Sequence, residues 1–148
     1  MTNMPAANSI ELSLPSRLGY EKIAMNTAAS VAELMGFSDD RIEDLKTAVA
    51  EACINSMEHG NQLNEALKVA VTLSMTEDSL EIKVADHGGG PSTDILQPNI
   101  DRKMQEEESP RGMGMFLIQS LVDEAEWLKS DEDGCYTRLV IHLRGPKR

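Results

Sequence analysis

Alternating apolar and polar residues predict that the chain begins with a strand and continues into a helix. From Ser9 to Leu14 every second residue is apolar, which is the period of a half-buried strand. Pro15 ends this strand, and Ser16 is expected to cap a helix that Gly36 closes. The apolar positions of that helix include Leu18, Ile23, Ala24, Ala28, Val31 and Met35.

A second helix is predicted to start at Ser38 and to end at Gly60. Asp40 and Glu43 have the spacing of a capping box near its start, and glycine is the usual residue at a helix end. Apolar residues recur with the helical period, which predicts one buried stripe along this helix. The stripe consists of Ile42, Leu45, Val49, Cys53 and Met57.

Four further strands are predicted, as two hairpins. Apolar and polar residues alternate in each strand, and a short polar turn separates the members of each pair. The strands are expected at residues 67–75, 80–84, 125–129 and 135–143. A helix over residues 112–123 precedes the second hairpin. This order favours an α+β fold, a two-layer α/β sandwich with helices on one face of a mainly antiparallel sheet.

The segment from Asp86 to Pro110 has no sustained periodicity. It holds three of the six prolines and three consecutive glycines. Loops of this length are uncommon in compact domains unless they have a function. We therefore expect this segment to belong to a functional site.

Length and charge limit the classes of protein that the chain can belong to. Its 148 residues suit one domain, and its net charge of -11 disfavours binding to nucleic acid or to anionic membranes. No apolar run approaches the roughly 20 residues of a membrane span, and the N-terminus does not resemble a secretory signal. Cys53 and Cys135 have no metal or redox spacing and are interpreted as free thiols, so we expect a cytoplasmic protein.

Three polar residues follow one side of the second predicted helix. Glu51, Asn55 and His59 are four residues apart and lie away from its apolar stripe. The oxygen donors of Glu51 and Asn55 suit Mg²⁺ or the positioning of a hydroxyl group. The spacing alone favours a plain solvated helix edge, so the functional interpretation needs further motifs.

Asp86 and the glycines that follow it form a second candidate. A carboxylate at a strand end can accept a hydrogen bond from an amine such as the amino group of adenine. Gly88 and Gly90 would let the backbone lie close to a flat ring. An ordinary glycine turn at a strand end is the alternative.

The third candidate is the sequence Arg111-Gly112-Met113-Gly114 at the start of a predicted helix. Free backbone N–H groups at a helix N-terminus can bind an anion, and glycine allows its close approach. The segment lacks the full P-loop and Rossmann glycine patterns. A joint between loop and helix is the alternative.

Together, in this order, the three motifs resemble those of the GHKL (Bergerat-fold) ATPases. Residues 51–60, Glu-Ala-Cys-Ile-Asn-Ser-Met-Glu-His-Gly, resemble the N box, and 86–90 resemble the Asp-x-Gly-x-Gly box. Residues 111–118, Arg-Gly-Met-Gly-Met-Phe-Leu-Ile, resemble the second glycine box. The long loop, about 87–110, falls where this family keeps its ATP lid. The third motif is similar to that of the anti-sigma-factor serine kinases of bacterial partner switching.

The resemblance implies a role for each matching residue. Asn55 would bind the Mg²⁺ that bridges the ATP phosphates, and Glu51 would be the general base for a serine or threonine hydroxyl. Asp86 would recognise adenine, with Gly88 and Gly90 leaving room for the ring. The phosphates would bind the backbone at Gly112, Met113 and Gly114, with Arg111 as an additional charge partner.

Three positions depart from the family pattern or stay open. Pro91 replaces a bulky apolar residue, and Gly134-Cys135-Tyr136-Thr137 replaces the usual Gly-Thr. Thr137 could supply the hydroxyl from a shifted position. The role of His59 is not assigned.

The implied activity is an ATP- and Mg²⁺-dependent serine-protein kinase that is also an anti-sigma factor. Such a protein phosphorylates an anti-anti-sigma antagonist, sequesters a sigma factor and commonly forms a homodimer. The alternatives are a partner-switching regulator with another target or without kinase activity, and the ATP-binding domain of a histidine kinase. The chain has no length for the phospho-accepting domain of the latter.

Overall fold

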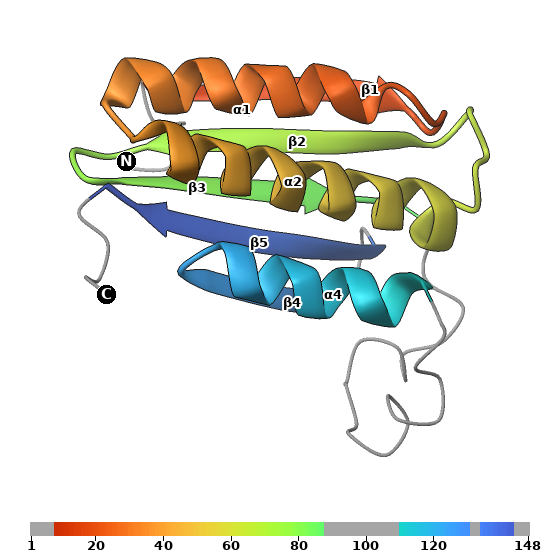
Figure 1. Cartoon of the computed structure of the whole chain (residues 1–148). Helices are drawn as coiled ribbons and strands as arrows, with labels where there is room; N and C mark the ends of the chain where they lie inside the picture. Colours follow the sequence, from red (N-terminus) through yellow and green to blue (C-terminus); the bar gives the residue numbers. More distant parts are fainter. Residues whose placement is uncertain (1–7, 88–109, 131–133, 144–148) are drawn as a thin grey trace.

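The computed structural model describes residues 8–87, 110–130 and 134–143 (Figure 1). The described residues form an antiparallel five-stranded sheet with the order β1-β2-β3-β5-β4. The strands are β1 (Ser9–Pro15), β2 (Lys68–Met75), β3 (Ser79–Ala85), β4 (Glu124–Ser130) and β5 (Gly134–His142). Both predicted hairpins are confirmed, as β2–β3 and β4–β5.

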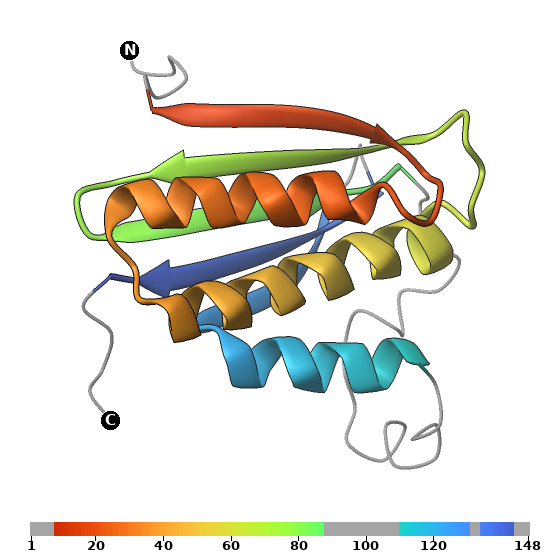
Figure 2. The ribbon, with the colours of Figure 1, turned by 45° about the horizontal axis from the view of Figure 1, so that its top comes forward.

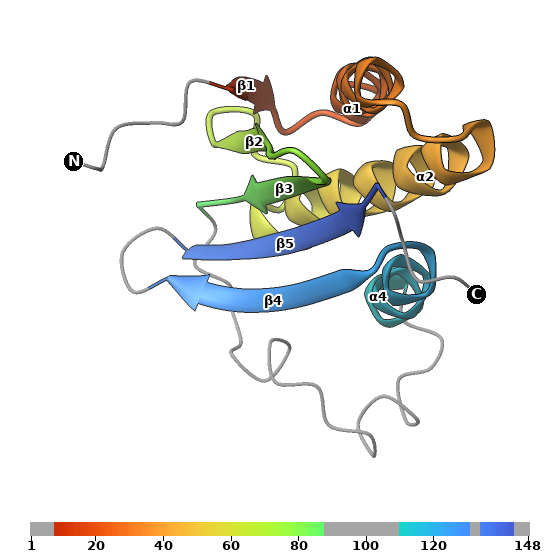
Figure 3. The same cartoon turned by 90° about the vertical axis from the view of Figure 1, so that its left-hand side faces the viewer.

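The helices of the described residues cover one face of the sheet, as Figure 3 shows from its end. They are α1 (Glu21–Met35), α2 (Asp39–Asn55), the π-helical turn η1 (Ser56–Gly60) and α4 (Pro110–Leu121). Figure 2 shows α1, α2 and α4 side by side, with α2 between the other two. The α+β class and the two-layer arrangement are therefore confirmed. No helix among the described residues is long and apolar enough to cross a membrane.

The core lies between the sheet and the helices. Each central strand turns its apolar residues to this side, and the register aligns Val71 with Val84 and Ile82 with Leu139. The apolar stripe that runs along α2 and into η1 consists of Leu45, Val49, Cys53 and Met57, all nearly inaccessible to solvent. Burial of these side chains fixes α2 over the middle of the sheet.

The first helix begins later than the sequence predicts. Ser16 does not cap it, because Ser16 is buried and donates its hydroxyl to the Leu67 carbonyl at 2.6 Å. The helix starts at Glu21 and ends, as predicted, at Gly36, which has a φ of 99°. The Ser16 hydroxyl bonds to Leu67, just before β2, and therefore does not cap the helix.

The second helix begins as predicted but differs in its capping interaction and at its C-terminal end. Its N-cap is Ser38, whose hydroxyl accepts a hydrogen bond from the Arg41 N–H, so the proposed capping box at Asp40 is wrong. The regular α-helix stops at Asn55, and the chain reaches Gly60 through η1. Turns of this π type often occur at functional sites.

Candidate functional site

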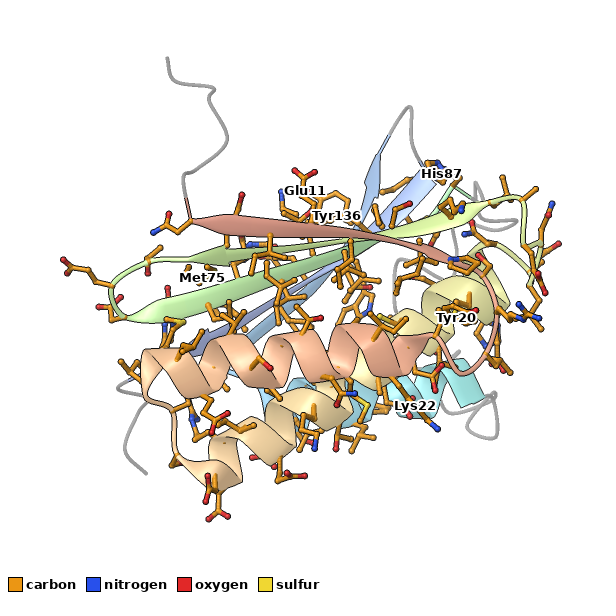
Figure 4. The ribbon with its side chains drawn as sticks, turned by 90° about the horizontal axis from the view of Figure 1, so that it is seen from above. Glu11, Tyr20, Lys22, Met75, His87 and Tyr136 are labelled. Carbon is orange, nitrogen blue, oxygen red and sulfur yellow. The ribbon has the colours of Figure 1, made fainter. Side chains whose placement is uncertain are left out.

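The three motifs meet at one end of the molecule. In Figure 1 the end of β3, the end of α2 with η1, and the start of α4 lie together at the right. Figure 4 places His87 at this end of the sheet and Met75 at the opposite end. The topology thus gathers residues that are up to 63 positions apart in the sequence, from Glu51 to Gly114.

Glu51 and Asn55 lie directly beneath the start of α4. A methyl group at Gly114 would lie 2.9 Å from Glu51 Oε1 and 3.2 Å from Asn55 Nδ2. Only glycine lets α4 come this close. Because α4 covers it, Asn55 is only 7% exposed.

The side-chain amide of Asn55 is buried, and its nitrogen is not paired. Among the described residues, Asn55 Nδ2 has no hydrogen-bond partner. Buried polar groups are normally paired, so an unpaired one indicates a bound group or a functional role. The interpretation of this helix side as a plain solvated edge is wrong for Asn55, while Glu51 is half-buried.

His59 lies in η1, beyond the regular helix. Its Nε2 is 3.9 Å from Glu58 Oε1, and the side chain is about a third exposed. The π-helical turn changes the angle between successive residues, so His59 does not continue the row of Glu51 and Asn55 with α-helical spacing.

Asp86 is buried immediately after β3. It is 3% exposed, and its backbone N–H donates to the Cys135 carbonyl at 2.9 Å. The carboxylate lies against Gly60, where a methyl group would collide with it. Asp86 is therefore held between β5 and η1.

A second glycine leaves room for the backbone of Asp86. Gly134 has a φ of 92°, and a methyl group there would lie 2.5 Å from the Asp86 carbonyl oxygen. The sequence predicts Gly134 only as part of a turn and Gly60 only as a helix end. Both are needed because a chain segment distant in sequence passes over them.

Thr137 lies near Asp86 in the sheet. It is buried and aligns with Val84, two residues before Asp86. Side chains two residues apart in extended chain point to the same face. Thr137 and Asp86 therefore occupy the helix-covered face on neighbouring segments.

Part of the predicted site lies outside the described residues. This applies to Gly88 and Gly90, to Pro91, and to the predicted lid except for its terminal residues, His87 and Pro110. The backbone of Arg111, Gly112 and Met113 forms the first turn of α4. The first N–H groups of a helix have no partner within it.

Both cysteines are buried, and neither forms a disulfide. Burial, together with the negative charge of Glu21, raises the pKa of Cys53 to about 12. The thiol stays protonated at neutral pH and is not a nucleophile.

A comparison with protein families decides the assignment. A family model described as a histidine kinase-like ATPase domain matches residues 14–141. The chain belongs to this family. The resemblance that the three motifs indicate is thereby confirmed.

Individual members of the family are similar over most of the chain. "Serine-protein kinase RsbW" of Bacillus licheniformis is 38% identical over 125 residues, which cover 80% of this chain and 77% of that protein. The protein of the same name from Bacillus subtilis (strain 168) is 35% identical, over 95% of this chain and 89% of that protein.

A solved structure has the same fold. The crystal structure of the RsbU and RsbW domains of Rv1364c from Mycobacterium tuberculosis matches with a TM-score of 0.66 at 16% identity. The match covers 95% of this chain and 32% of that chain. At this identity the likeness concerns the fold alone.

Proposed function

We propose that this chain is an ATP- and Mg²⁺-dependent serine-protein kinase of the cytoplasm that also acts as an anti-sigma factor. The RsbW relatives, named as serine-protein kinases, support the kinase activity. The observation that carries the proposal is the placement of Glu51 and Asn55 beneath Gly114. A carboxylate and an amide whose Nδ2 has no partner among the described residues thus lie beside the first turns of α4.

The buried end of β3 suits an adenine ring. Asp86 would accept a hydrogen bond from the exocyclic amino group of the base. Gly60 and Gly134 leave the space that its carboxylate and backbone occupy. In this proposal Gly88 and Gly90 flank the ring.

The start of α4 suits the phosphates. The backbone at Gly112, Met113 and Gly114 would bind phosphate oxygens, favoured by the helix dipole. Because α4 begins at Pro110, the N–H of Gly112 is among the first N–H groups of the helix, which have no partner within it. Arg111 would add a positive charge. This cradle lies directly above Glu51 and Asn55.

The donor set at Asn55 fits Mg²⁺ that arrives with a nucleotide. Within the described part of the chain, no group of three or more His, Cys, Asp or Glu could hold a metal. Mg²⁺ typically takes one or two protein oxygens and completes its shell with phosphates and water. Asn55 would supply the amide oxygen, and the ion would neutralise charge on the phosphates.

Glu51 would act as the general base. Its carboxylate would take the proton of the attacking hydroxyl as the new oxygen–phosphorus bond forms and ADP leaves. A half-buried position lets it reach a serine presented by another protein. We therefore assign proton transfer to Glu51 and phosphate positioning to Asn55 and α4.

The proposed partners are an anti-anti-sigma antagonist as substrate and a sigma factor as the sequestered protein. A phosphate on the antagonist would weaken its complex through added negative charge. The strongly acidic chain would hold a basic partner, without direct contact to nucleic acid or membrane.

We further propose one kinase domain over residues 1–148, with the lid at about 87–110, and a homodimer in which α1 forms part of the interface.

The kinase proposal is tested by transfer of labelled phosphate from ATP to a purified candidate antagonist. Wild type should label the antagonist on serine, and Glu51→Gln should transfer at least about a hundredfold more slowly while still binding ATP. Glu43→Gln on the exposed side of the same helix is the matched control and should behave like wild type.

Two results would count against this assignment. Equal transfer by Glu51→Gln and wild type would remove Glu51 as the base. Binding of Mg-ATP without transfer to any antagonist from the same genome would favour a binding regulator. Capture of a sigma factor in the presence of ADP and of ATP separates an anti-sigma factor from other partner switchers.

A further inference from the structure

Asn61, the residue after the N box, is almost completely buried between four segments of the chain. It is 1% exposed and follows η1 directly. Its Nδ2 lies 2.9 Å from Ser16 Oγ and 3.2 Å from the Lys68 carbonyl oxygen. Its Oδ1 accepts a hydrogen bond from the His87 backbone N–H at 2.9 Å. One side chain, directly after η1, therefore links the residue after β1, the start of β2 and the segment after β3.

The hydrogen bond to His87 concerns the peptide group that joins Asp86 to His87. The other peptide group of Asp86 is held by β5, because the Asp86 N–H donates to the Cys135 carbonyl at 2.9 Å. With both flanking peptides fixed, the backbone of Asp86 has little freedom to turn. The direction of its carboxylate relative to Gly60 and η1 is then set.

We infer that Asn61 is a positioning residue that sets the orientation of Asp86 and thereby the affinity and base selectivity of the nucleotide site. This inference rests on the proposed nucleotide-dependent function. Asn61 acts through the Asp86–His87 peptide, not by contact with the reacting atoms. Gly60 and Asn61 are adjacent, so the end of η1 contacts the carboxylate of Asp86 and the residue after η1 contacts the following peptide.

A purely structural role is the competing explanation. Gln62 and Leu63, just after Asn61, have φ values of 54° and 58°, which residues other than glycine seldom adopt. The donor half of the Asn61 amide, with Ser16, ties this turn to the start of β2. The acceptor half alone reaches the proposed site, so the two roles can be separated by substitution.

The experiment compares Asn61→Ala with the matched control Ser16→Ala. Asn61→Ala removes both halves of the network, whereas Ser16→Ala removes only bonds at the β1–β2 end. We expect Asn61→Ala to raise the KM for ATP about tenfold, with kcat at saturating ATP within about twofold of wild type. Ser16→Ala should lower the melting temperature without changing this KM.

Base selectivity is the second readout. GTP carries a carbonyl oxygen where ATP carries the amino group, so a fixed Asp86 carboxylate favours ATP. The ratio of kcat/KM for ATP over GTP should fall in Asn61→Ala and stay at the wild-type value in Ser16→Ala. A general loss of stability would not change this ratio.

Two outcomes overturn the inference. One is that Asn61→Ala keeps the wild-type KM for ATP and the wild-type ratio of kcat/KM for ATP over GTP. The other is that Asn61→Ala and Ser16→Ala change these two quantities equally. If wild type binds and transfers phosphate normally but Asn61→Ala is unchanged, only the inference fails. If wild type binds no nucleotide, the proposed function fails as well.

A measurement on wild type keeps the test valid if Asn61→Ala does not fold. The His87 amide hydrogen is predicted to exchange slowly with solvent, although the side chain is exposed, and more slowly with bound ADP. Fast exchange of this amide in both states contradicts the role of Asn61.

Discussion

At the scale of single residues, the site depends on glycines that leave no space for a methyl group. Gly134 combines a φ of 92° with the close approach of the Asp86 backbone, and Gly114 adjoins Glu51. The Asp86 carbonyl belongs to the backbone, so it cannot move aside at low cost. A methyl at Gly134 should therefore disturb both the fold and Asp86.

We predict that Gly134→Ala lowers the free energy of unfolding by about 2 to 4 kcal/mol. Gly36→Ala is the matched control, because Gly36 has a φ of 99° but no atom within 4 Å of the added methyl. It should lose only about 1 kcal/mol, the cost of the left-handed conformation. Urea unfolding of both variants measures the difference, and equal losses would disprove the clash with Asp86.

The sequence identifies the polar residues of the site more readily than the glycines and amides that support them. Glu51, Asn55 and Asp86 belong to ordered motifs whose chemistry can be read locally. Gly60, Gly134 and Asn61 matter because of segments up to 48 positions away in the sequence, as between Gly134 and Asp86. The pattern of neighbouring residues does not indicate contacts between segments that are distant in the sequence.

At the scale of elements, the close packing of α4 on α2 brings the phosphate cradle to the proposed base. Hairpins were predictable because alternation depends only on neighbouring residues. The start of α1 was not, since the Leu67 carbonyl, just before β2, provides the partner for Ser16. The π-helical turn at η1 also escapes prediction, because the apolar period continues through Met57.

We predict that Gly114→Ala slows phosphate transfer about a hundredfold, because the methyl displaces Glu51 or lifts α4. The control is Ser120→Ala on the same helix, because Ser120 is exposed and its hydroxyl donates to the Leu117 carbonyl at 2.7 Å. The labelled-phosphate assay compares the two. Transfer at the wild-type rate in Gly114→Ala would mean that α4 does not set the position of Glu51.

At the scale of the whole molecule, one core joins the sheet to the helices. The sequence predicts the β2–β3 and β4–β5 pairs, but not that β3 lies beside β5, because that contact spans the long loop. Cys53 lies at the centre of this core, and burial raises its pKa to about 12. Its ionisation is therefore linked to unfolding of the entire domain.

We predict that alkaline pH destabilises the protein partly through Cys53. Below pH 9 the thiol keeps its proton in both states; above it, the unfolded chain loses the proton while the folded chain retains it up to about pH 12. This thiol then lowers the free energy of unfolding by about 1.4 kcal/mol per pH unit. Urea unfolding between pH 8 and pH 10.5 should show a shallower decline in Cys53→Ala than in wild type, and identical declines would refute the linkage.

The central claim is that Glu51, Asn55 and Asp86 belong to one nucleotide site, and nucleotide affinity with and without Mg²⁺ tests it most directly. Asp86→Asn should weaken ATP binding in both conditions, because it removes the negative charge and replaces one of the two acceptor oxygens that face adenine by an NH₂ donor. Asn55→Ala should remove only the part of the affinity and turnover that depends on Mg²⁺. Unchanged affinity and turnover in both variants would contradict the account.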